Sequence, residues 1–380
     1  MYISCTKGKS QTTVNHISSD TTITDSKFKV SFPKLTKEFI ESNKSYLEHF
    51  YNSKYGSDFS GGFLVAKNGQ IIYEHYNGYA YKEKDIKIDE HTPIHVASVS
   101  KVITATTVLR LVDQGKVKLD QTVQSILPTF PYAETTVRML LNHRSGMRNY
   151  AYFTDNKAIW DRKTPLTNQD VLNIMATHNI GLESRINNRF QYCNTNYVML
   201  ALIVEKVTNK TFPDAVKEMI FDPLGMTDSF IFHDMEKKDE VSQSYKSSNI
   251  RLAWEYLDVT YGDKNMFTTA RDLLKFDSAT YSNDFLSNEV KQEMFRGYSY
   301  ERKGNKNYGL GFRLIEFERG PLYIFHNGWW HGNTASYVTL RDEKVTIISL
   351  SNKYTTKTYK TKQLASHFGD YPFEGDEGDE

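Results

Sequence analysis

Strand-forming segments occur at both ends of the chain, and helix-forming segments lie between them. Near the N-terminal end, two apolar runs at 63–67 and 70–74 flank Asn68-Gly69, the pair favoured in two-residue hairpin turns. Near the other end, strand patterns cover 322–326, 335–340 and 345–350. A polar segment at 341–344 joins the last two runs as a second hairpin. This layout implies an antiparallel sheet assembled from both termini, flanked by helices and carrying a mostly helical insertion, which is an α+β fold and not an alternating βαβ fold.

Helix-like spacing of apolar residues is found at 35–52, 98–114, 168–178, 197–208, 213–220, 270–280 and 357–368. From these patterns we divide the chain into a disordered leader (1–31), a sheet subdomain (32–119 and 252–370), a helical subdomain (120–251) and an acidic tail (371–380). A cleft between the sheet and helical parts is the natural place for a functional site.

The composition is that of an ordinary globular protein, with 39% hydrophobic and 24% charged residues. The formal net charge of +1 gives no electrostatic footprint for nucleic acid. No apolar run approaches the length of a membrane-spanning helix. No metal-binding motif occurs either, so we predict neither a metal site nor a cofactor.

The two cysteines, Cys5 and Cys193, are not expected to pair, because Cys5 lies in a polar tail and Cys193 in a well-patterned segment. Residues 2–5 are similar to the end of a bacterial lipoprotein signal, which makes Cys5 a candidate lipid anchor. The apolar stretch that should precede such a signal is absent, so a plain tail with a chance cysteine is the alternative.

Ser98 and Lys101 form a Ser-x-x-Lys tetrad at the start of a predicted helix. Positions i and i+3 share one helix face, so the hydroxyl and the amine can approach each other, and free N–H groups lie beside them. A serine hydroxyl becomes a good nucleophile when a neighbouring base takes its proton, and a lysine is such a base in its neutral form. The same Ser-x-x-Lys spacing occurs at 4–7 and 31–34, but neither of these serines starts a predicted helix. The position at a helix start therefore favours Ser98.

A second candidate is Tyr192-Cys193-Asn194, which leads into a predicted helix. A tyrosine beside a lysine can share its proton, and an asparagine amide can orient the lysine and a substrate carbonyl. Residues 281–283 have the same Tyr-x-Asn spacing, so the spacing alone does not choose between them. Either tyrosine could instead be an ordinary core or surface ring in a tyrosine-rich chain.

The third candidate, His326-Asn327-Gly328, ends a predicted strand. Glycine there permits close approach of a ligand to the strand edge, and a cation could hold a carboxylate or a developing negative charge. The N–H group of Trp329 could pair with that of Ser98 as an oxyanion hole. The alternative for His326 is a hydrogen-bonded structural histidine.

In this order the three elements resemble those of the penicillin-recognising serine hydrolases, which include class C β-lactamases, D-alanyl-D-alanine carboxypeptidases, D-aminopeptidases and related esterases. The resemblance extends over about 63–352. Further segments that carry it are Leu140-Leu141-Asn142-His143-Arg144-Ser145-Gly146, Asp222-Pro223-Leu224-Gly225-Met226, Gly262-Asp263-Lys264, Thr269-Ala270-Arg271-Asp272-Leu273 and Tyr308-Gly309-Leu310-Gly311-Phe312. It implies a β-lactamase/transpeptidase-like fold, and it favours Tyr192, since Tyr281 lies after the Asp272-Leu273 landmark.

The resemblance also implies the chemistry. Ser98 would be the acylated nucleophile, with Lys101 and Tyr192 sharing the acid and base work. The substrate would be bound by the residues of the other two motifs, namely Asn194, His326, Gly328 and the backbone of Trp329. We therefore predict a serine hydrolase that forms an acyl-enzyme with a peptide, ester, D-amino acid amide or β-lactam. The alternative is an inactive relative that binds cell-wall peptide or a protein partner.

Two positions depart from the family pattern. His326 stands where β-lactamases usually carry lysine, so efficient β-lactam hydrolysis is not expected, and Cys193 stands where serine is usual. We interpret Cys193 as a small filler and not as a reactive thiol. The family further implies a bacterial cell-envelope or periplasmic location. The sequence leaves the substrate, the oligomeric state and the physiological role open.

Overall fold

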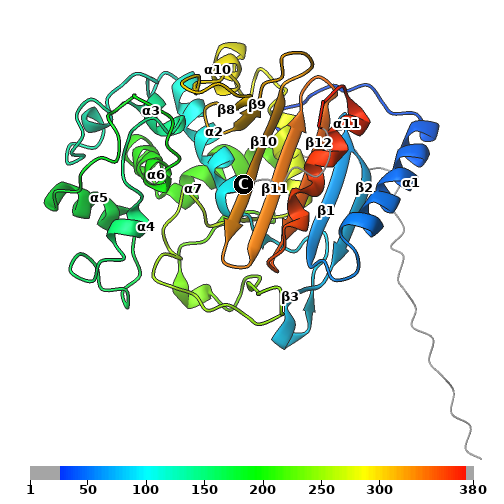
Figure 1. The fold of residues 1–380 in the computed structure, drawn as a ribbon, viewed down its shortest axis with the longest axis horizontal. Coiled ribbons are helices and arrows are strands. Elements are labelled where there is room, and N and C mark those ends of the chain that lie inside the picture. The colour runs from blue at the N-terminus through cyan, green and yellow to red at the C-terminus, as the bar shows by residue number, and fades with distance from the viewer. Residues whose placement is uncertain (1–25, 374–380) are drawn as a thin grey trace, which may run out of the picture.

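The computed structural model describes residues 26–373, and its centre is a seven-stranded antiparallel sheet in the order β2-β1-β12-β11-β10-β9-β8 (Figure 1). The strands are β1 (Gly61–Lys67), β2 (Gln70–Asn77), β8 (Lys306–Tyr308), β9 (Arg313–Ile315), β10 (Tyr323–Trp330), β11 (Asn333–Leu340) and β12 (Val345–Ser351). β1 pairs with β12, so the two ends of the chain meet in the middle of the sheet. The predicted α+β fold is confirmed.

Both predicted hairpins are present. Asn68 and Gly69 have φ values of 53° and 69°, the left-handed conformation that a tight two-residue turn requires, and they join β1 to β2. Residues 341–344 join β11 to β12, which pair from Leu340 opposite Val345. These turns set the register of four of the seven strands.

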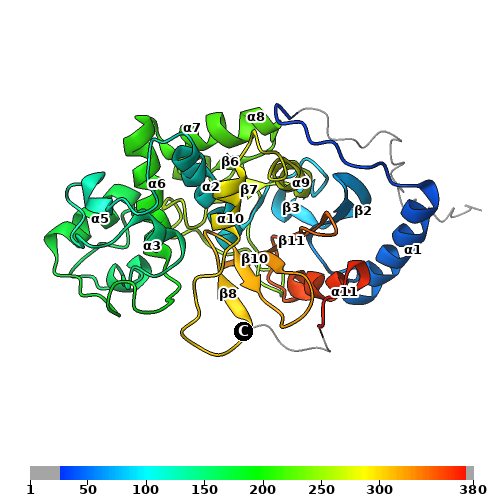
Figure 2. The same ribbon diagram turned by 90° about the horizontal axis from the view of Figure 1, so that it is seen from above.

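The central strands are buried on both faces, because a separate hydrophobic core packs on each side of the sheet. In β1, Phe63 and Val65 belong to the core beneath α1, whereas Leu64 and Ala66 belong to the larger core beneath α2 and α9. Figures 1 and 2 show α1 (Lys37–Lys54) and α11 (Ala365–Phe368) on one side of the sheet and α2 (Ser100–Asp113) and α9 (Ala270–Ala279) on the other. Two-sided burial explains why the apolar run at 63–66 in β1 does not alternate with polar residues.

The other helices are α3 (Val137–Leu141), α4 (Tyr150–Phe153), α5 (Asn168–Thr177), α6 (Asn194–Thr208), α7 (Phe212–Val216), α8 (Asp222–Leu224) and α10 (Asn288–Met294). Short strands β3 (Tyr79–Tyr81) and β4 (Ile86–Lys87) pair with each other, and β5 (Ile94–His95), β7 (Met266–Thr268) and β6 (Phe230–Ile231) form a three-stranded sheet. Within residues 26–373, no helix combines the length and the apolar character that a membrane span requires.

Several predicted bounds differ from the structure. The helix predicted at 98–114 begins as a short 3-10 helix, Ala97–Val99, before α2, and the segment predicted as a helix at 357–368 is a 3-10 helix over Lys357–Leu364. α6 begins three residues before its apolar pattern does, at Asn194. β10 continues past the predicted end at 326, because its polar and glycine residues pair with β11. For β10 the pairing with another strand decides the boundary, and apolar spacing does not report it.

The predicted outer boundaries were also displaced. Phe28, placed in the leader, packs edge-on against Phe285 at 5.2 Å, and the Lys27 N–H group donates to the Pro223 carbonyl. Tyr371, placed in the tail, is buried, and its hydroxyl donates to Glu343. Packed residues thus extend beyond the predicted boundaries at 31 and 371, because Phe28 and Tyr371 bury apolar surface. Cys5 lies outside the described residues, and the division into two subdomains stays a prediction.

Candidate active site

Ser98 occupies a strained turn between β5 and α2. Every residue from Ile94 to Leu109 is buried except Ser98, which is partly exposed. Ala97 has a φ of 48°, a left-handed conformation that costs a non-glycine residue free energy, and its N–H group donates to His95 Nδ1 at 3.1 Å. The turn therefore presents the Ser98 hydroxyl at the surface of an otherwise buried segment.

Lys101 lies directly behind this hydroxyl and is fully buried. Its Nζ donates to Ser98 Oγ at 3.0 Å and to the backbone oxygen of Asp263 at 2.7 Å. Within the described part of the chain, no carboxylate oxygen lies within 4 Å of Lys101 Nζ. The amine thus faces the nucleophile without an acid to hold it as an ion pair.

Of the two Tyr-x-Asn candidates, Tyr192 and Tyr281, the fold brings Tyr192 to Lys101. Lys101 Nζ lies 5.0 Å from the centre of the Tyr192 ring. The ring packs against that of His143 at 4.3 Å and beneath the Arg313 guanidinium at 5.0 Å. The competing Tyr281 packs under Arg341 at 3.5 Å, away from this cluster.

Asn194 stands on the first turn of α6, two residues after Tyr192. Its Oδ1 is buried and has no hydrogen-bond partner. Asn327 Oδ1, next to His326 on β10, is likewise buried and unpartnered. One amide belongs to a predicted site residue and the other lies next to one in the chain, and a buried oxygen left unsatisfied is costly unless a ligand completes it.

His143 was missed as a site residue, although the segment that contains it was recognised. Its Nδ1 accepts from the Cys193 N–H group at 3.1 Å and from Asn196 Nδ2 at 3.0 Å, so the neutral ring carries its hydrogen on Nε2, which has no partner. Burial, with the charges of Lys101 and Arg313, lowers the pKa of His143 well below its usual value. The neutral His143 ring therefore supports Tyr192 by packing against its ring. Arg313 carried no recognisable sequence signal.

His326 is fully buried and is not the cation expected at this position. Its Nδ1 donates to the Asn327 carbonyl at 2.8 Å, and its Nε2 accepts from the Tyr308 hydroxyl at 3.1 Å, which is the bonding of a neutral imidazole. Burial, together with the charges of Arg313 and Lys101, lowers the pKa of His326 well below its usual value. The expected positive charge is absent because desolvation outweighs any gain from binding a proton.

Gly328 brings β10 into contact with the nucleophile turn. A Cβ atom at this position would lie 2.3 Å from the Val96 carbonyl oxygen and 3.0 Å from the Ser98 nitrogen, so only glycine fits. The next residue, Trp329, is 64% exposed. The backbone of β10 thus runs past Ser98 at van der Waals distance.

Cys193 is a buried free cysteine at the residue preceding α6. Burial raises the pKa of its thiol to about 11, although hydrogen bonds from Thr195 and Asn196 oppose the increase. It is protonated at neutral pH, in agreement with its interpretation as a filler.

Residues 56–367 match the family model described as Beta-lactamase. The chain belongs to this family. It is 30% identical over 318 residues to a penicillin-binding protein of Bacillus subtilis (strain 168), covering 80% of this chain and 70% of the relative. It is 24% identical over 337 residues to the teichoic acid D-alanine hydrolase of Staphylococcus aureus, covering 83% of this chain and 80% of that protein.

Among solved structures, a penicillin-binding protein from Bacillus halodurans superposes with a TM-score of 0.72 at 21% identity, over 88% of this chain and 99% of that one. This likeness confirms the β-lactamase/transpeptidase-like fold. The chain is accordingly a serine hydrolase of the Beta-lactamase family, as predicted.

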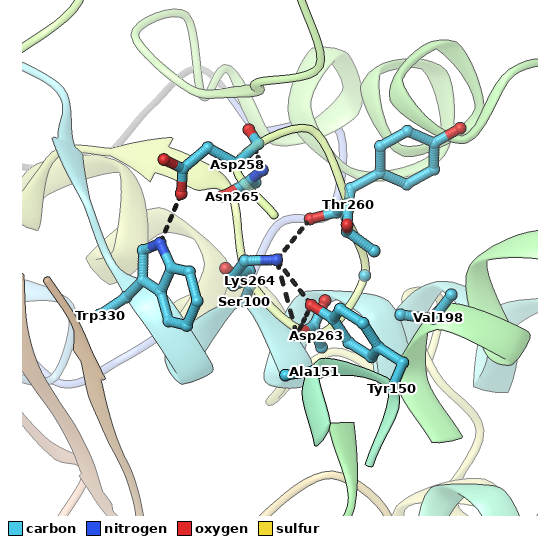
Figure 3. A network of polar contacts seen from close by, with 12 residues as sticks. Ser100, Tyr150, Ala151, Val198, Asp258, Thr260, Asp263, Lys264, Asn265 and Trp330 are labelled. Carbon is cyan, nitrogen blue, oxygen red and sulfur yellow. Dashed lines mark hydrogen bonds and ion pairs between the residues drawn. The ribbon is translucent and has the colours of Figure 1, made fainter. Parts of the chain in front are cut away.

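A second buried lysine supports the site of this Beta-lactamase family member from behind. Lys264 Nζ donates to Tyr150 Oη at 2.7 Å and to the Thr260 carbonyl at 3.1 Å, and it lies 3.9 Å from Asp263 Oδ2. Tyr150 Oη in turn donates to Asp263 Oδ2 at 3.0 Å. Figure 3 shows Lys264 pointing toward Tyr150 and Asp263. This network fixes the position of Asp263, whose backbone carbonyl accepts a hydrogen bond from Lys101 Nζ.

Proposed function

We propose that this serine hydrolase works by acyl transfer through Ser98, with Lys101 and Tyr192 as its acid–base pair. The observation that carries the proposal is the 3.0 Å contact between Lys101 Nζ and Ser98 Oγ at the one partly exposed position of a buried segment. A nucleophile and a base within hydrogen-bond reach, with the base oriented by a third group, is the recognisable geometry of covalent catalysis. Here the third group is the Asp263 carbonyl.

In the proposed reaction, the Ser98 oxygen attacks a substrate carbonyl while its proton passes to the Lys101–Tyr192 pair. The developing oxyanion accepts from the N–H groups of Ser98 and Trp329, which the contact at Gly328 brings to one side of the carbonyl. The bond to the leaving group then breaks, and the pair returns the proton to that group. Water, deprotonated by the same pair, then attacks the ester, and the pair returns this proton to the Ser98 oxygen as the acyl group leaves.

We propose that Asn194 and Asn327 hold the substrate through the oxygens left unpartnered in the free protein. An acceptor oxygen binds an N–H or O–H donor, which peptides, amides and D-alanyl esters carry. His326 enters as a neutral hydrogen-bonding group and gives no ion pair to a carboxylate at neutral pH. This favours amides, esters and peptides without a carboxylate beside the scissile bond over β-lactams as good substrates.

Relatives whose names refer to penicillin binding and to teichoic acid support a substrate from the bacterial cell wall. We therefore propose a location in the cell envelope. Neither a metal nor a cofactor has a part in the proposed reaction.

The test is covalent labelling with a fluorophosphonate, followed by hydrolysis of a substrate panel. The panel contains a D-Ala-D-Ala peptide, a short-chain ester, a D-amino acid amide and a chromogenic cephalosporin. We expect labelling of the wild type and of Ser100→Ala, a buried serine two residues away, but not of Ser98→Ala. We expect Ser98→Ala to lose about a thousandfold or more of the hydrolysis. Labelling that survives in Ser98→Ala would contradict the nucleophile, and rapid cephalosporin hydrolysis would contradict the substrate preference.

A further inference from the structure

The peptide group between Gly328 and Trp329 has a hydrogen-bond partner outside the three motifs. The hydroxyl of Tyr359 donates to the Gly328 carbonyl oxygen at 3.0 Å, across 31 residues of sequence. Tyr359 belongs to the 3-10 helix Lys357–Leu364, which packs against β11 and β12. In Figure 1 this helix is the red segment that leads into α11. A helix near the end of the chain thus reaches the backbone that runs past Ser98.

The Gly328 carbonyl is the other end of the group that carries the Trp329 N–H. The atoms of a peptide bond lie in one plane, and in the usual trans form the C=O and N–H groups point in opposite directions. A partner that fixes the direction of the Gly328 carbonyl therefore also fixes the direction of the Trp329 N–H group.

The sheet itself holds this peptide group along one edge. Among the described residues, β9 pairs with β10 over 323–325 and not beyond, so from His326 onward β11 is the one strand partner of β10. β10 ends two residues after Gly328, where Trp330 pairs with Asn333 at the turn to β11. A strand end with a free edge is less restrained than the middle of a sheet. The hydrogen bond from Tyr359 adds a restraint at this place.

Two buried hydroxyl pairs fix the helix that carries Tyr359. Thr358 Oγ1 lies 2.8 Å from Thr334 Oγ1, and Thr361 Oγ1 lies 2.7 Å from Ser336 Oγ on the same strand, β11. All four of these residues are buried. Buried polar groups that are satisfied by one another specify a single arrangement, so the helix has a fixed position on β11. Tyr359 lies between the two threonines and is placed with them.

We propose that Tyr359 is a positioning residue of the oxyanion hole. Its hydroxyl aims the Trp329 N–H group at the oxygen that becomes negative when Ser98 attacks. It also polarises the peptide group, so that this N–H group is a stronger donor. Tyr359 acts through the peptide group and not by touching the substrate. The inference rests on the proposed function and deepens it, because it adds a residue that supports the same site.

The expected effect is smaller than that of losing a donor. Removal of one donor from an oxyanion hole lowers kcat about 100- to 1,000-fold. In Tyr359→Phe the Trp329 N–H group stays in place but loses a restraint, so we expect kcat for p-nitrophenyl butyrate to fall by about tenfold. KM should change less than about twofold, because an interaction made mainly in the transition state affects kcat.

A second ester separates this role from a merely structural one. The thionoester of the same substrate carries sulfur in place of the carbonyl oxygen. Donors placed for oxygen fit the larger sulfur poorly, so the wild type should prefer the oxygen ester. Tyr359→Phe should lose most of this preference. The ratio of the two rates does not depend on how much of the variant is folded.

Tyr371→Phe is the matched control. It also removes a hydrogen-bonded hydroxyl near the end of the chain, but this hydroxyl donates to Glu343 and not to β10. We expect Tyr371→Phe to keep the wild-type kcat and the wild-type preference for the oxygen ester.

The amide resonance of Trp329 measures the contact without any reaction. The chain has four tryptophans, so labelling with ¹⁵N-tryptophan gives few backbone signals, and Trp329→Phe identifies the signal of Trp329. In the Ser98→Ala background, Tyr359→Phe should move this signal, and Tyr371→Phe should leave it in place.

The outcomes distinguish the inference from the proposed function. An unchanged kcat in Tyr359→Phe overturns the inference and leaves the proposed function intact. A lower kcat with an unchanged ester preference, or with an unmoved Trp329 signal, shows a structural role and overturns the inference as well. If the wild type hydrolyses no ester and Ser98 is not labelled, the proposed function fails, and the inference fails with it.

Discussion

Two lysines are buried within the same region of the molecule, yet their surroundings differ. Lys264 faces the Asp263 carboxylate, the Tyr150 hydroxyl and the rings of Tyr150 and Trp330. Lys101 faces a serine hydroxyl and a backbone carbonyl. Burial lowers the pKa of Lys264, and the charges of Asp263 and Asp258 oppose this change.

The difference separates a structural role from a chemical one. Removing one partner of a buried ion pair leaves the other charge uncompensated, so Lys264 should matter most for folding. Lys101 has no buried counter-charge, so its removal leaves the Asp263 carbonyl without one donor but leaves no uncompensated charge, and the loss of stability should be smaller. We therefore expect substitution of Lys101 to lower mainly the activity and substitution of Lys264 to lower mainly the stability.

The largest effect is expected for Lys101→Met. If Lys101 is the base for Ser98, ester hydrolysis should fall by about a thousandfold, within the range for loss of a general base. The free energy of unfolding should change little, because an apolar chain of similar length relieves the burial of the amine while the Asp263 carbonyl loses one hydrogen bond. Activity assays and urea titrations check both parts. An active Lys101→Met protein would remove Lys101 from the mechanism.

Lys264→Met should give the opposite pattern. We expect the free energy of unfolding to drop by about 3–5 kcal/mol, since Asp263 loses its buried counter-charge. The double variant Lys264→Met with Asp263→Asn is the control, and it should be more stable than the sum of the two single losses. Additive losses in urea titrations would show that Asp263 and Lys264 do not act as a pair.

Tyr192→Phe should lower kcat/KM about a hundredfold, because the phenol that shares the proton of Lys101 is lost while the ring remains. Tyr281→Phe, the other member of the Tyr-x-Asn pair, should retain wild-type activity. Equal losses at both positions would contradict the selection of Tyr192 by the packing around Lys101.

Acid should destabilise the protein through His95. This buried residue accepts from the Ala97 N–H group in the nucleophile turn and lines a pocket beside Trp254 and Trp330. Burial lowers the pKa of His95 to about 4, despite the hydrogen bond to Asn265. Between about pH 6.5 and 4 the unfolded chain binds the proton and the folded chain does not. Stability is therefore lost as pH falls through this window, by on the order of 1 kcal/mol for each pH unit.

Urea titrations at pH 7.5 and 5.5 measure this dependence. His95→Gln should show a smaller loss of stability between the two pH values than the wild type. The exposed His49 provides the control, and His49→Gln should keep the wild-type dependence. An unchanged dependence in His95→Gln would show that His95 already binds a proton when folded.

The smallest effect is expected for Cys193→Ser, which should stay within about twofold of wild-type activity, because the buried thiol takes no part in the reaction. A thiol reagent should modify Cys193 only after urea unfolds the chain. Rapid modification of the native protein would indicate a reactive thiol.

Local patterns predicted the sheet well, because hairpin turns and strands buried on both faces leave signals within a few residues. Asn68-Gly69 and the apolar run of β12 are examples. Local patterns failed where a segment distant in the sequence determines the structure. β10 remains a strand through Asn327 and Gly328 because β11 pairs with it, and Phe28 is held by Phe285. Neither partner can be read from the local sequence.

The site shows the same division. Ser98 and Lys101 were predicted from their spacing within one helical turn, and the structure places Lys101 Nζ 3.0 Å from Ser98 Oγ. Choosing Tyr192 over Tyr281 required the family resemblance, since both have the same local pattern. The neutral state of His326 could not be predicted, because it depends on burial and on Arg313 and Tyr308 from other strands. Arg313 and the pocket beyond Trp330 depend wholly on tertiary packing.

The missing side chain at Gly328 has a consequence for how such an enzyme can diversify. With the Val96 carbonyl and the Ser98 nitrogen already against it, this stretch can meet a bound molecule only through main-chain atoms. Point substitutions cannot reshape a surface made of peptide groups. New selectivity would have to arise in the flanking segments around 242–258 and 329–333, whose side chains can change while the machinery for bond cleavage stays fixed.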